Sequence, residues 1–324
     1  MKLGIISVAH MHAYSYANAI AKVDGVQLVG VADEDEVRGK AAAEKFGVPF
    51  FSDYHELLAT DIDAVIVTSE NAKHQEHTLA AAKAGKHILC EKPLATTAEA
   101  AQEMIDFCHE QGVILQTAFP VRFHPAVVRA KQLVEQGKVG RIMAIRGTNR
   151  GQNPGGWFVD REKSGGGAVI DHTVHVVDLM RWFMDSEVRE VYAEVDSKFS
   201  DTPIDDCGIL TMEFENGVFA TLDCSWSRNK AFPTWGDVTM EIIGTEGTIS
   251  LDAFSQKLDV YSNEKGLKWV NWGDDMDSQL VKDFVTSVRE KKAPSITGED
   301  GLRAVEVALA AYQSAEQKQP VVLR

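Results

Sequence analysis

Two stretches of the sequence hold side chains suited to acid–base chemistry. Lys92 stands between Glu91 and Pro93, directly after an apolar run. Pro93 fixes its own φ angle and biases Lys92 towards an extended conformation. Farther along, Asp171 and His175 are spaced i and i+4, so on a helix they share a face where a carboxylate can orient an imidazole. A titrating imidazole beside a lysine suits proton transfer near neutral pH.

Each of these features also has an ordinary structural explanation. An isolated lysine in a loop is usually a solvated surface group, and an Asp–His pair on one helix face is about as often structural as functional. Three glycines, at 165–167, precede the helical stretch and would permit a ligand to approach the backbone closely. Asp178 and Arg181 fall on neighbouring positions, and His172 is expected to point elsewhere on the helix.

A third candidate side chain is Asp33, which ends the apolar run 27–32. At the end of the second strand of a nucleotide-binding βαβ unit, an acidic residue accepts hydrogen bonds from the hydroxyls of the adenosine ribose. Glu34 follows, and two adjacent carboxylates would repel a 2′-phosphate, so the pattern favours NAD over NADP. Arg38, one helical turn farther on, leaves NADP as the lesser alternative. Asp33 could also simply begin the next helix.

The start of the chain has the pattern of such a unit without its glycines. The run KLGIISV at 2–8 is followed by helix-compatible residues, and the positions of the G-x-G-x-x-G pattern are taken by Ser7, Ala9 and His12. Ser7 is tolerable if the turn keeps φ negative, whereas the methyl of Ala9 should weaken contact with a pyrophosphate. Amides at the start of the first helix, or the side chains of His10 and His12, could compensate. We expect no metal site on this histidine pair, because the sequence shows no third ligand.

Up to about residue 118 the elements alternate between strand and helix. Near-continuous apolar runs separated by helices predict an α/β domain, a doubly wound parallel sheet covered on both faces. Its ligand should lie beyond the carboxyl ends of the strands. The expected strands are 2–8, 27–32, 64–67, 87–90 and 114–118, and the expected helices are 13–23, 36–46, 74–84 and 97–111, with glycines at 47, 85 and 112 closing three of them.

Past residue 120 the pattern changes to α+β with a large, mostly antiparallel sheet open on one face. After a helix over 125–136, period-two strands are expected at 210–214, 218–226, 238–242 and 248–251, with Asn216-Gly217 as a hairpin turn. Helices over 277–292 and 299–316 close the chain. We expect domains at 1–120 and 121–324, and the C-terminal helices could pack back on the first domain.

Composition narrows the class of protein. With 324 residues, 44% of them hydrophobic and 25% charged, the chain has the composition of a soluble globular protein. Its net charge of −15 disfavours nucleic acid and anionic membrane surfaces as partners. No apolar run reaches the roughly 18 residues of a membrane span, and the first run lacks a signal-peptide cleavage pattern. Four cysteines without C-x-x-C spacing, at 90, 108, 207 and 224, indicate buried free thiols in a cytoplasmic protein.

Together the motifs resemble the Gfo/Idh/MocA family (glucose–fructose oxidoreductase, inositol dehydrogenase, MocA) along essentially the whole chain. The matching stretches are AGKHILCEKPLA at 84–95, RFHP at 122–125, GKVGRI at 137–142, GGGAVIDHTVH at 165–175 and GTEGTI at 244–249. The resemblance implies an N-terminal Rossmann domain and an NAD(P)-dependent oxidoreductase acting on a sugar, inositol or related polyol. It also implies a homodimer or homotetramer, since the open-faced sheet usually serves as a subunit interface in this family.

By position, the resemblance assigns Lys92, Asp171 and His175 to catalysis. His175 would accept the proton of a substrate hydroxyl, Lys92 would polarise the oxygen or share the base role, and Asp171 would hold His175 or bind a neighbouring hydroxyl. The cofactor-binding candidates are Ser7, Ala9, His10, Met11, Asp33, Arg38, Ser69, Asn71, His74, Glu91 and Lys92. The substrate-binding candidates, an aromatic among scattered polar groups, are Asn149, Arg150, Trp157, Asp160, Asp171, His172 and His175. The polar and aromatic residues at 146–162 could almost equally well belong to a loop with a purely structural role.

Two other functions fit the same residues. Some members of the family hold NAD tightly and use transient oxidation to process a sugar without net redox change. The family also includes a sugar-pathway regulator that has lost enzymatic activity. The intact Lys92, Asp171 and His175 argue against a regulator. The altered loop at 7–12 leaves the regulator as an alternative.

Overall fold

A computed structural model describes residues 1–323 and divides them into two compact units. The first unit comprises Met1–Pro120, Glu162–Gly165 and Asp275–Leu302. The second comprises Val121–Arg161, Gly166–Asp274 and the chain from Arg303 onward. The last two long helices thus fall in different units over much of their length, α9 (Met276–Glu290) in the first and most of α10 (Gly298–Gln317) in the second.

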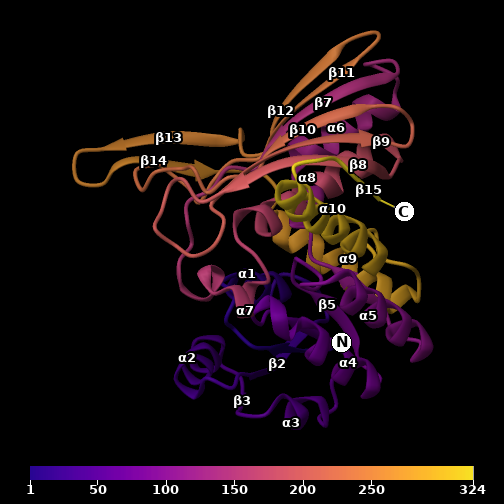
Figure 1. The fold of residues 1–324 in the computed structure, drawn as a ribbon. Coiled ribbons are helices and arrows are strands. Elements are labelled where there is room, and N and C mark those ends of the chain that lie inside the picture. The colour runs from indigo at the N-terminus through magenta and orange to yellow at the C-terminus, as the bar shows by residue number, and fades with distance from the viewer. Residues whose placement is uncertain (324) are drawn as a thin grey trace. The chain divides into compact units, whose positions relative to one another are not determined.

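A six-stranded parallel sheet forms the centre of the first unit, in the order β3-β2-β1-β4-β5-β6 (Figure 1). Its strands are β1 (Lys2–Ile6), β2 (Gln27–Ala32), β3 (Phe50–Phe51), β4 (Ala64–Val67), β5 (His87–Cys90) and β6 (Leu115–Thr117). The strand order reverses between β1 and β4, and ligands of doubly wound sheets bind beyond the carboxyl ends of the strands at such a switch point. The predicted α/β fold of this part is confirmed.

The helices of the first unit are α1 (His12–Ile20), α2 (Glu36–Phe46), α3 (Tyr54–Leu58), α4 (His74–Lys83), α5 (Ala98–Glu110) and α9, with a short 3₁₀ helix η1 (Asn71–Lys73). Every residue of β4 is buried, as expected for a strand covered on both faces. Gly47, Gly85 and Gly112 follow their helices with φ of 69°, 71° and 67°, the left-handed conformation predicted for them. The short elements β3 and α3 were not predicted, because two and five residues are too few for a periodic pattern.

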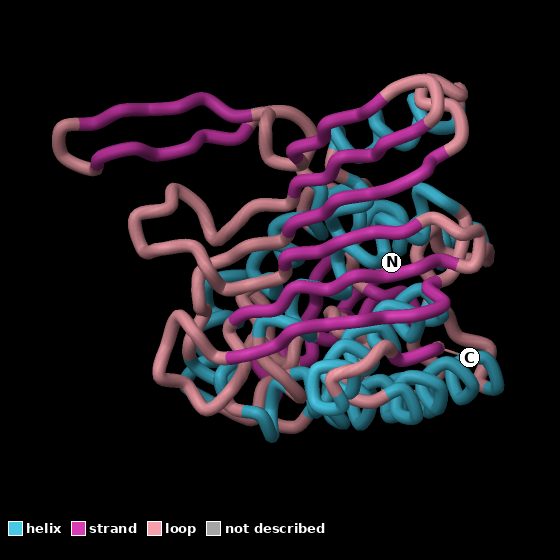
Figure 2. The backbone as a smooth tube through the Cα atoms, turned by 45° about the horizontal axis from the view of Figure 1, so that its top comes forward, coloured by secondary structure: helices cyan, strands magenta, loops and turns pink. Residues whose placement is uncertain are grey.

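The second unit contains a seven-stranded sheet in the order β12-β11-β7-β10-β9-β8-β15, whose strands run side by side in Figure 2. The strands are β7 (Ile142–Thr148), β8 (Val188–Asp196), β9 (Cys207–Phe214), β10 (Phe219–Asp223), β11 (Thr239–Gly244), β12 (Thr248–Asp252) and β15 (Val321–Val322). All pairs are antiparallel except β7 with β10. A separate hairpin, β13 (Lys257–Ser262) and β14 (Gly266–Asn271), extends from this unit and was not predicted.

One face of this sheet packs against α8 (Ala168–Met184), as the close approach of Gly147 to Val176 and Met180 shows. The helix α6 (Pro125–Glu135) lies at its β12 end, and the short α7 (Arg161–Ser164) and η3 (Gly156–Val159) precede α8 along the chain. The other face carries exposed apolar side chains at Tyr192, Ile209, Phe219 and Ile243. The predicted sheet with one open face is confirmed.

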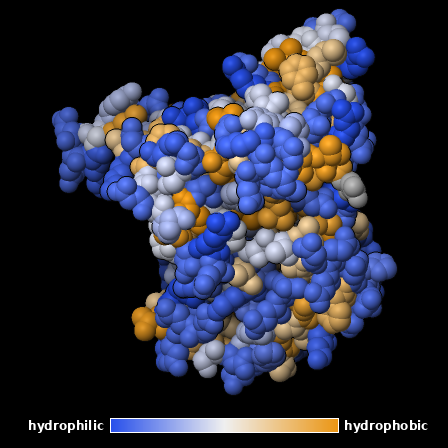
Figure 3. Space-filling view, in the orientation of Figure 1, coloured by the Kyte–Doolittle hydropathy of each residue, from blue (hydrophilic) through white to orange (hydrophobic). Residues whose placement is uncertain are grey.

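The visible molecular surface is mostly hydrophilic, with apolar side chains in small separate patches (Figure 3). None of the described helices is long and apolar enough to cross a membrane. All four cysteines are free; Cys90, Cys108 and Cys224 are buried as predicted, whereas Cys207, at the start of β9, is only partly buried.

Candidate active site

In the first unit, Asp33 lies buried at the carboxyl end of β2. Its Oδ2 accepts hydrogen bonds from the amide of Val8 at 2.7 Å and from Nε of Arg38 at 3.0 Å. Its Oδ1 accepts from the amide of Asp35 at 2.9 Å and from Nη2 of Arg38 at 2.7 Å. Nη1 of Arg38 also lies 3.9 Å from Glu70. The positive charge of Arg38 is therefore shared between two carboxylates.

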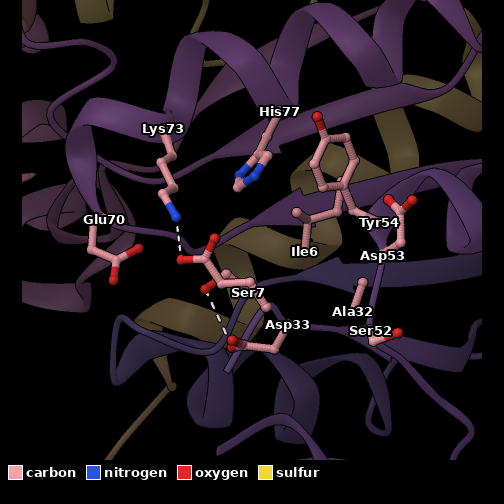
Figure 4. Close-up of a pocket in the computed structure, with 11 residues that line it drawn as sticks. Ile6, Ser7, Ala32, Asp33, Ser52, Asp53, Tyr54, Glu70, Lys73 and His77 are labelled. Carbon is pink, nitrogen blue, oxygen red and sulfur yellow. Dashed lines mark hydrogen bonds and ion pairs between the residues drawn. The ribbon is translucent and has the colours of Figure 1, made fainter. Parts of the chain in front are cut away.

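A small pocket of about 110 Å³ opens beside Asp33 (Figure 4). It is lined by Ile6, Ser7, Ala32, Asp33, Glu34, Ser52, Asp53, Tyr54, Glu70, Lys73 and His77. The only lysine in this lining, Lys73, forms an ion pair with Glu34. Burial lowers the pKa of His77 to about 4, so its imidazole is neutral near pH 7. Sequence reasoning missed Ser52, Asp53, Tyr54, Lys73 and His77, mostly because β3 and α3 were not recognised.

The loop after β1 departs from expectation at Ser7, which has a φ of +62°. The condition set for this residue, a negative φ, is not met. A non-glycine residue in this conformation costs about 1–2 kcal/mol. The Ser7 hydroxyl offsets part of that cost, because it donates to Oδ2 of Asp33 at 3.3 Å and accepts from the amide of Ala9 at 3.2 Å.

The amides that a glycine loop would turn towards a phosphate are bonded inside this protein. The amide of His10 donates to Thr68 O at 3.0 Å, and that of His12 donates to Nδ1 of His10 at 3.2 Å. The amide of Ala13 donates to His10 O at 3.1 Å. With the Val8 and Ala9 bonds described above, five of the six amides at 8–13 are bonded inside the protein, all but that of Met11. Met11, also a cofactor-binding candidate, has an exposed side chain.

Glu91, at the end of β5, joins this loop to the segment that holds Lys92. Its fully buried carboxylate accepts from the amide of Lys92 at 3.0 Å, from the Tyr16 hydroxyl and from Nδ1 of His12 at 2.9 Å. Nε2 of His10 lies 4.0 Å from its other oxygen. Burial alone would raise the pKa of Glu91, but its electrostatic attraction to His10 and His12 and the hydrogen bond from His12 outweigh burial and hold that pKa well below its usual range. Sequence spacing could not reveal this third member of the His10–His12 pair, since it lies 79 residues from His12.

His74 holds the loops after β4 and β5 together. Its Nδ1 lies 2.9 Å from Pro93 O and its Nε2 lies 3.2 Å from Ser69 O, and the ring is completely buried. Burial lowers its pKa, which favours the neutral ring. Asn71 donates from Nδ2 to Ser164 O at 2.8 Å, while its buried Oδ1 has no hydrogen-bond partner. The structure thus brings Ser69, Asn71, His74, Glu91 and Lys92 to one edge of the sheet, and their role in cofactor binding stays a prediction.

In the second unit, α8 begins where the backbone leaves no room for a side chain. A Cβ on Gly167 would lie 1.9 Å from Asp205 O. The Asp205 carboxylate accepts from the amides of Gly167 at 2.9 Å and Val169 at 2.8 Å, and from the Tyr312 hydroxyl at 2.9 Å. A carboxylate at this position satisfies the first amides of the helix and its dipole. The start of α8 is therefore fixed firmly.

Asp171, His172 and His175 are all buried on α8. Oδ2 of Asp171 lies 3.3 Å from Nε2 of His172 and accepts from Nε1 of Trp226 at 3.2 Å. His172, expected to point elsewhere on the helix, is therefore a neighbour of this carboxylate. Trp226 was missed by sequence reasoning because it lies 55 residues farther along the chain.

Two other motif residues have structural partners in the same unit. Arg122, from RFHP, makes a bidentate pair with Asp178 on α8 at 2.8 and 2.5 Å. Arg181 pairs with Glu187 at 2.6 Å. These ion pairs account for the charged residues on the remaining faces of α8.

The loop after β7 holds the other substrate-binding candidates. Asn149 is completely buried, with Nδ2 bonded to Asp237 O at 2.9 Å and Oδ1 without a hydrogen-bond partner. Arg150 pairs with the Asp237 carboxylate at 3.1 Å. A Cβ on Gly151 would lie 2.6 Å from the His172 ring, so this loop packs against the histidine. Trp157 and Asp160 are half-buried, and Trp157 stacks on Phe158 with ring centroids 3.9 Å apart.

Comparison with known families decides the class of protein. A model described as an oxidoreductase family with an NAD-binding Rossmann fold matches residues 1–119, and one described as the GFO/IDH/MocA C-terminal domain matches residues 127–250. The chain belongs to the GFO/IDH/MocA family. The resemblance inferred from the motifs is confirmed, and the protein is an oxidoreductase with an NAD-binding Rossmann domain.

Individual proteins of known sequence or structure match this chain over nearly its whole length and nearly the whole of their own. Myo-inositol 2-dehydrogenase of Thermotoga maritima is 30% identical over 100% of this chain and 98% of its own. The structure of GenD2 from gentamicin A biosynthesis in complex with NAD has a TM-score of 0.91, at 27% identity over 100% of this chain and 96% of its own. Scyllo-inositol dehydrogenase of Lactobacillus casei, with bound NAD(H) and scyllo-inositol, has a TM-score of 0.85 at 27% identity over 99% and 98%.

Proposed function

We propose that this oxidoreductase is an NAD-dependent dehydrogenase that transfers a hydride between nicotinamide and a secondary hydroxyl of a sugar, an inositol or a related polyol. The observation that carries the proposal is that Lys92, Asp171 and His175 are all retained, at buried positions on firmly held elements. Similar proteins named for myo-inositol and scyllo-inositol dehydrogenation support the class of substrate.

The residues of the first unit fit NAD. Asp33 lies where an adenosine ribose would be recognised, at the edge of a small pocket that Ser7 and Glu70 also line. The charge of Arg38 is committed to Asp33 and Glu70, and that of Lys73 to Glu34, so neither side chain is left to neutralise a 2′-phosphate. We therefore propose NAD rather than NADP, although some related proteins are named as NADP-dependent.

The chain's own residues would divide the chemistry between them. Bound NAD would supply the hydride acceptor, C4 of its nicotinamide. The Lys92 ammonium would donate a hydrogen bond to the substrate oxygen and polarise it, and His175 would accept the hydroxyl proton. Asp171, bonded to Trp226 and beside His172, would hold this part of α8 in position and could accept a hydrogen bond from a neighbouring hydroxyl.

We also propose that copies of the chain associate through the open face of the second unit's sheet into a homodimer or homotetramer. Tyr192, Ile209, Phe219 and Ile243 are exposed by 37%, 51%, 58% and 39%, which is unusual for apolar residues on neighbouring strands. Light scattering of the purified protein tests this association. A strictly monomeric protein would overturn it.

The direct test of the function is NADH formation, followed at 340 nm, with a panel of inositols and sugars. We expect turnover with at least one polyol and NAD, and little with NADP. A protein that retains NAD through purification and converts a sugar without accumulating NADH would be a redox-neutral enzyme instead. A protein that binds sugar and NAD but converts neither would be a regulator.

A further inference from the structure

The imidazole of His12 is held by one of its two nitrogens only. Nδ1 lies 2.9 Å from Oε1 of Glu91, whose side chain is fully buried, while 28% of the His12 side chain remains exposed. The rings of His10 and Tyr16, with centroids 4.4 and 5.8 Å away, fix its plane. The exposed edge is therefore the one opposite Glu91, which carries Nε2. That atom has no hydrogen-bond partner among the described residues.

The surroundings of His12 favour its charged form. Burial lowers its pKa, but the attraction of Glu91 outweighs burial, so the pKa is raised above the ordinary 6.5. Asp277, on the packed helix α9, raises it further, and Lys92 opposes with its own charge. The Tyr16 hydroxyl, whose pKa is raised well above 10 by burial and by Glu91, stays protonated and donates to Glu91.

The backbone around His12 has little left to offer an anion. In a glycine loop, main-chain amides at the start of the first helix bind the diphosphate. Here the amides of Val8, Ala9, His10, His12 and Ala13 all bond inside the protein. The amide of Met11 is not among these bonded groups, so it is the main-chain donor left to a dinucleotide at this switch point, and a side-chain donor beside it would strengthen the hold on the phosphates.

We propose that His12, as an imidazolium oriented by Glu91, is the group that binds the diphosphate of the dinucleotide in place of the amides of a glycine loop. Nε2–H would donate to a phosphate oxygen, and the positive charge would attract the anion. The inference deepens the proposed function, since it rests on the binding of a dinucleotide to the first unit. It gives a role to a histidine at a position where the glycine pattern has none.

A metal ion is the other occupant that this cluster suggests. The ligand atoms of His10, His12 and Glu91 all lie within 4.8 Å of one another. However, Nδ1 of His10 accepts the amide of His12, which in a neutral ring leaves the proton on Nε2, the atom that faces Glu91. A histidine that binds a metal instead donates through its second nitrogen. Oε1 of Glu91 also already accepts from Tyr16 and His12. The geometry favours the hydrogen-bonded cluster.

The test compares ADP-ribose with adenosine by calorimetry, because only ADP-ribose has a diphosphate and that diphosphate does not titrate near neutral pH. In the wild type, ADP-ribose should bind more weakly as pH rises through the pKa of His12, since the imidazolium is lost, while adenosine affinity stays constant. His12→Gln should lower ADP-ribose affinity about tenfold, the value of one charge-assisted hydrogen bond, and leave adenosine unchanged. His12→Lys should restore ADP-ribose binding and remove the pH dependence.

The matched control is His109→Gln, at an exposed histidine on α5 far along the chain from the loop, which should change neither affinity. Equal losses for ADP-ribose and adenosine in His12→Gln would overturn the inference, as would no loss at all or no binding of ADP-ribose by the wild type. Stoichiometric zinc that survives dialysis, with ADP-ribose binding abolished by EDTA, would replace it with a metal site. NADH formation is measured separately: His12-dependent ADP-ribose binding without any NADH formation would overturn the dehydrogenase and support this inference.

Discussion

The loop after β1 and the segment after β5 lie at the same edge of one sheet, yet they depart from their family differently. The segment Glu91–Pro93 keeps every residue of its motif, whereas the loop at 7–12 has none of its three glycines. The structure shows that the two are joined, because Glu91 accepts a hydrogen bond from His12 and holds the amide of Lys92. The unchanged segment Glu91–Pro93 thus holds the altered loop in place through the Glu91 carboxylate.

The comparison implies that the segment after β5 supplies chemistry and the loop after β1 supplies binding. Lys92→Met should therefore lower turnover by about 10²–10⁴ with little effect on the affinity for NAD. His175→Asn, which keeps the shape but removes the titrating group, should do likewise. The double variant should be little worse than either single variant if both groups serve one proton transfer. Near-normal turnover of both single variants on an active polyol would remove them from the mechanism and favour the regulator.

The contact between the two regions should matter greatly for stability. Glu91→Gln leaves the partly exposed His12 without its counter-charge and weakens the buried acceptor that Tyr16 and His12 share, which should cost about 1.5–3 kcal/mol of unfolding free energy. The matched control is Glu34→Gln, which breaks the half-exposed Glu34–Lys73 pair and should cost less than about 1 kcal/mol. Urea denaturation of both variants measures the difference. Equal small losses would mean that Glu91 does not hold the loop.

The same contact predicts how stability depends on pH. The pKa of Glu91 is lower in the folded protein than in the unfolded chain, so its contribution is present above the unfolded value and is lost as pH falls through the folded one. The pKa of His12 is raised, so its contribution is present below the unfolded value and is lost as pH rises through the folded one. The wild type should therefore lose stability on both sides of a window between the ordinary pKa values of the two groups, 4.5 and 6.5, and Glu91→Gln should have a flatter profile. An unchanged profile in that variant would contradict the ion pair.

The sequence predicted the bounds of helices and strands well where the elements are long or are bounded by glycine and other turn residues. The helix at 36–46 and the strands at 27–32, 64–67 and 87–90 have their expected bounds. The hairpin turn at Gly217, with a φ of +81°, was also recognisable, because Asn-Gly selects that conformation. Among the segments that were missed, 50–58 and 257–271 are short or exposed on both faces, so they have no clear apolar period. The strands β7 and β8 were also missed.

The residues of the candidate site could be predicted from sequence only where they lie close together in the chain. The motif residues were found, since each lies within a few positions of the others in its motif. The partners that decide what they do, such as Glu91 for His12, Trp226 for Asp171 and Asp237 for Arg150, lie 55 to 87 residues away. The φ of Ser7 could not be predicted, because its hydroxyl bonds depend on Asp33 in the next strand.

Cofactor choice tests whether the loop after β2 keeps its family role beside the altered loop. With Arg38 and Lys73 neutralised by carboxylates, a 2′-phosphate would meet acidic groups, and NAD should bind about tenfold to a hundredfold more tightly than NADP. Asp33→Asn should narrow this preference, since it frees the Arg38 guanidinium. Calorimetric titrations with both cofactors measure it, and equal or tighter binding of NADP by the wild type would be the contrary result.

The smallest effects are expected in the glycine positions themselves. Ala9→Gly should leave NAD affinity within about twofold or tighten it slightly, because the Ala9 amide is already bonded to the Ser7 hydroxyl and a phosphate cannot use it freely.

Ser7→Gly removes the left-handed strain of about 1–2 kcal/mol but also loses that hydroxyl, so the unfolding free energy should change by less than about 1 kcal/mol. Ser7→Ala keeps the strain and loses the hydroxyl, and should be the less stable of the two serine variants by about 1 kcal/mol. Thermal denaturation separates them. If Ser7→Ala were as stable as Ser7→Gly, the left-handed φ of residue 7 would not be a source of strain. A marked loss of NAD affinity in Ala9→Gly would place the diphosphate against the Ala9 methyl instead of beside His12.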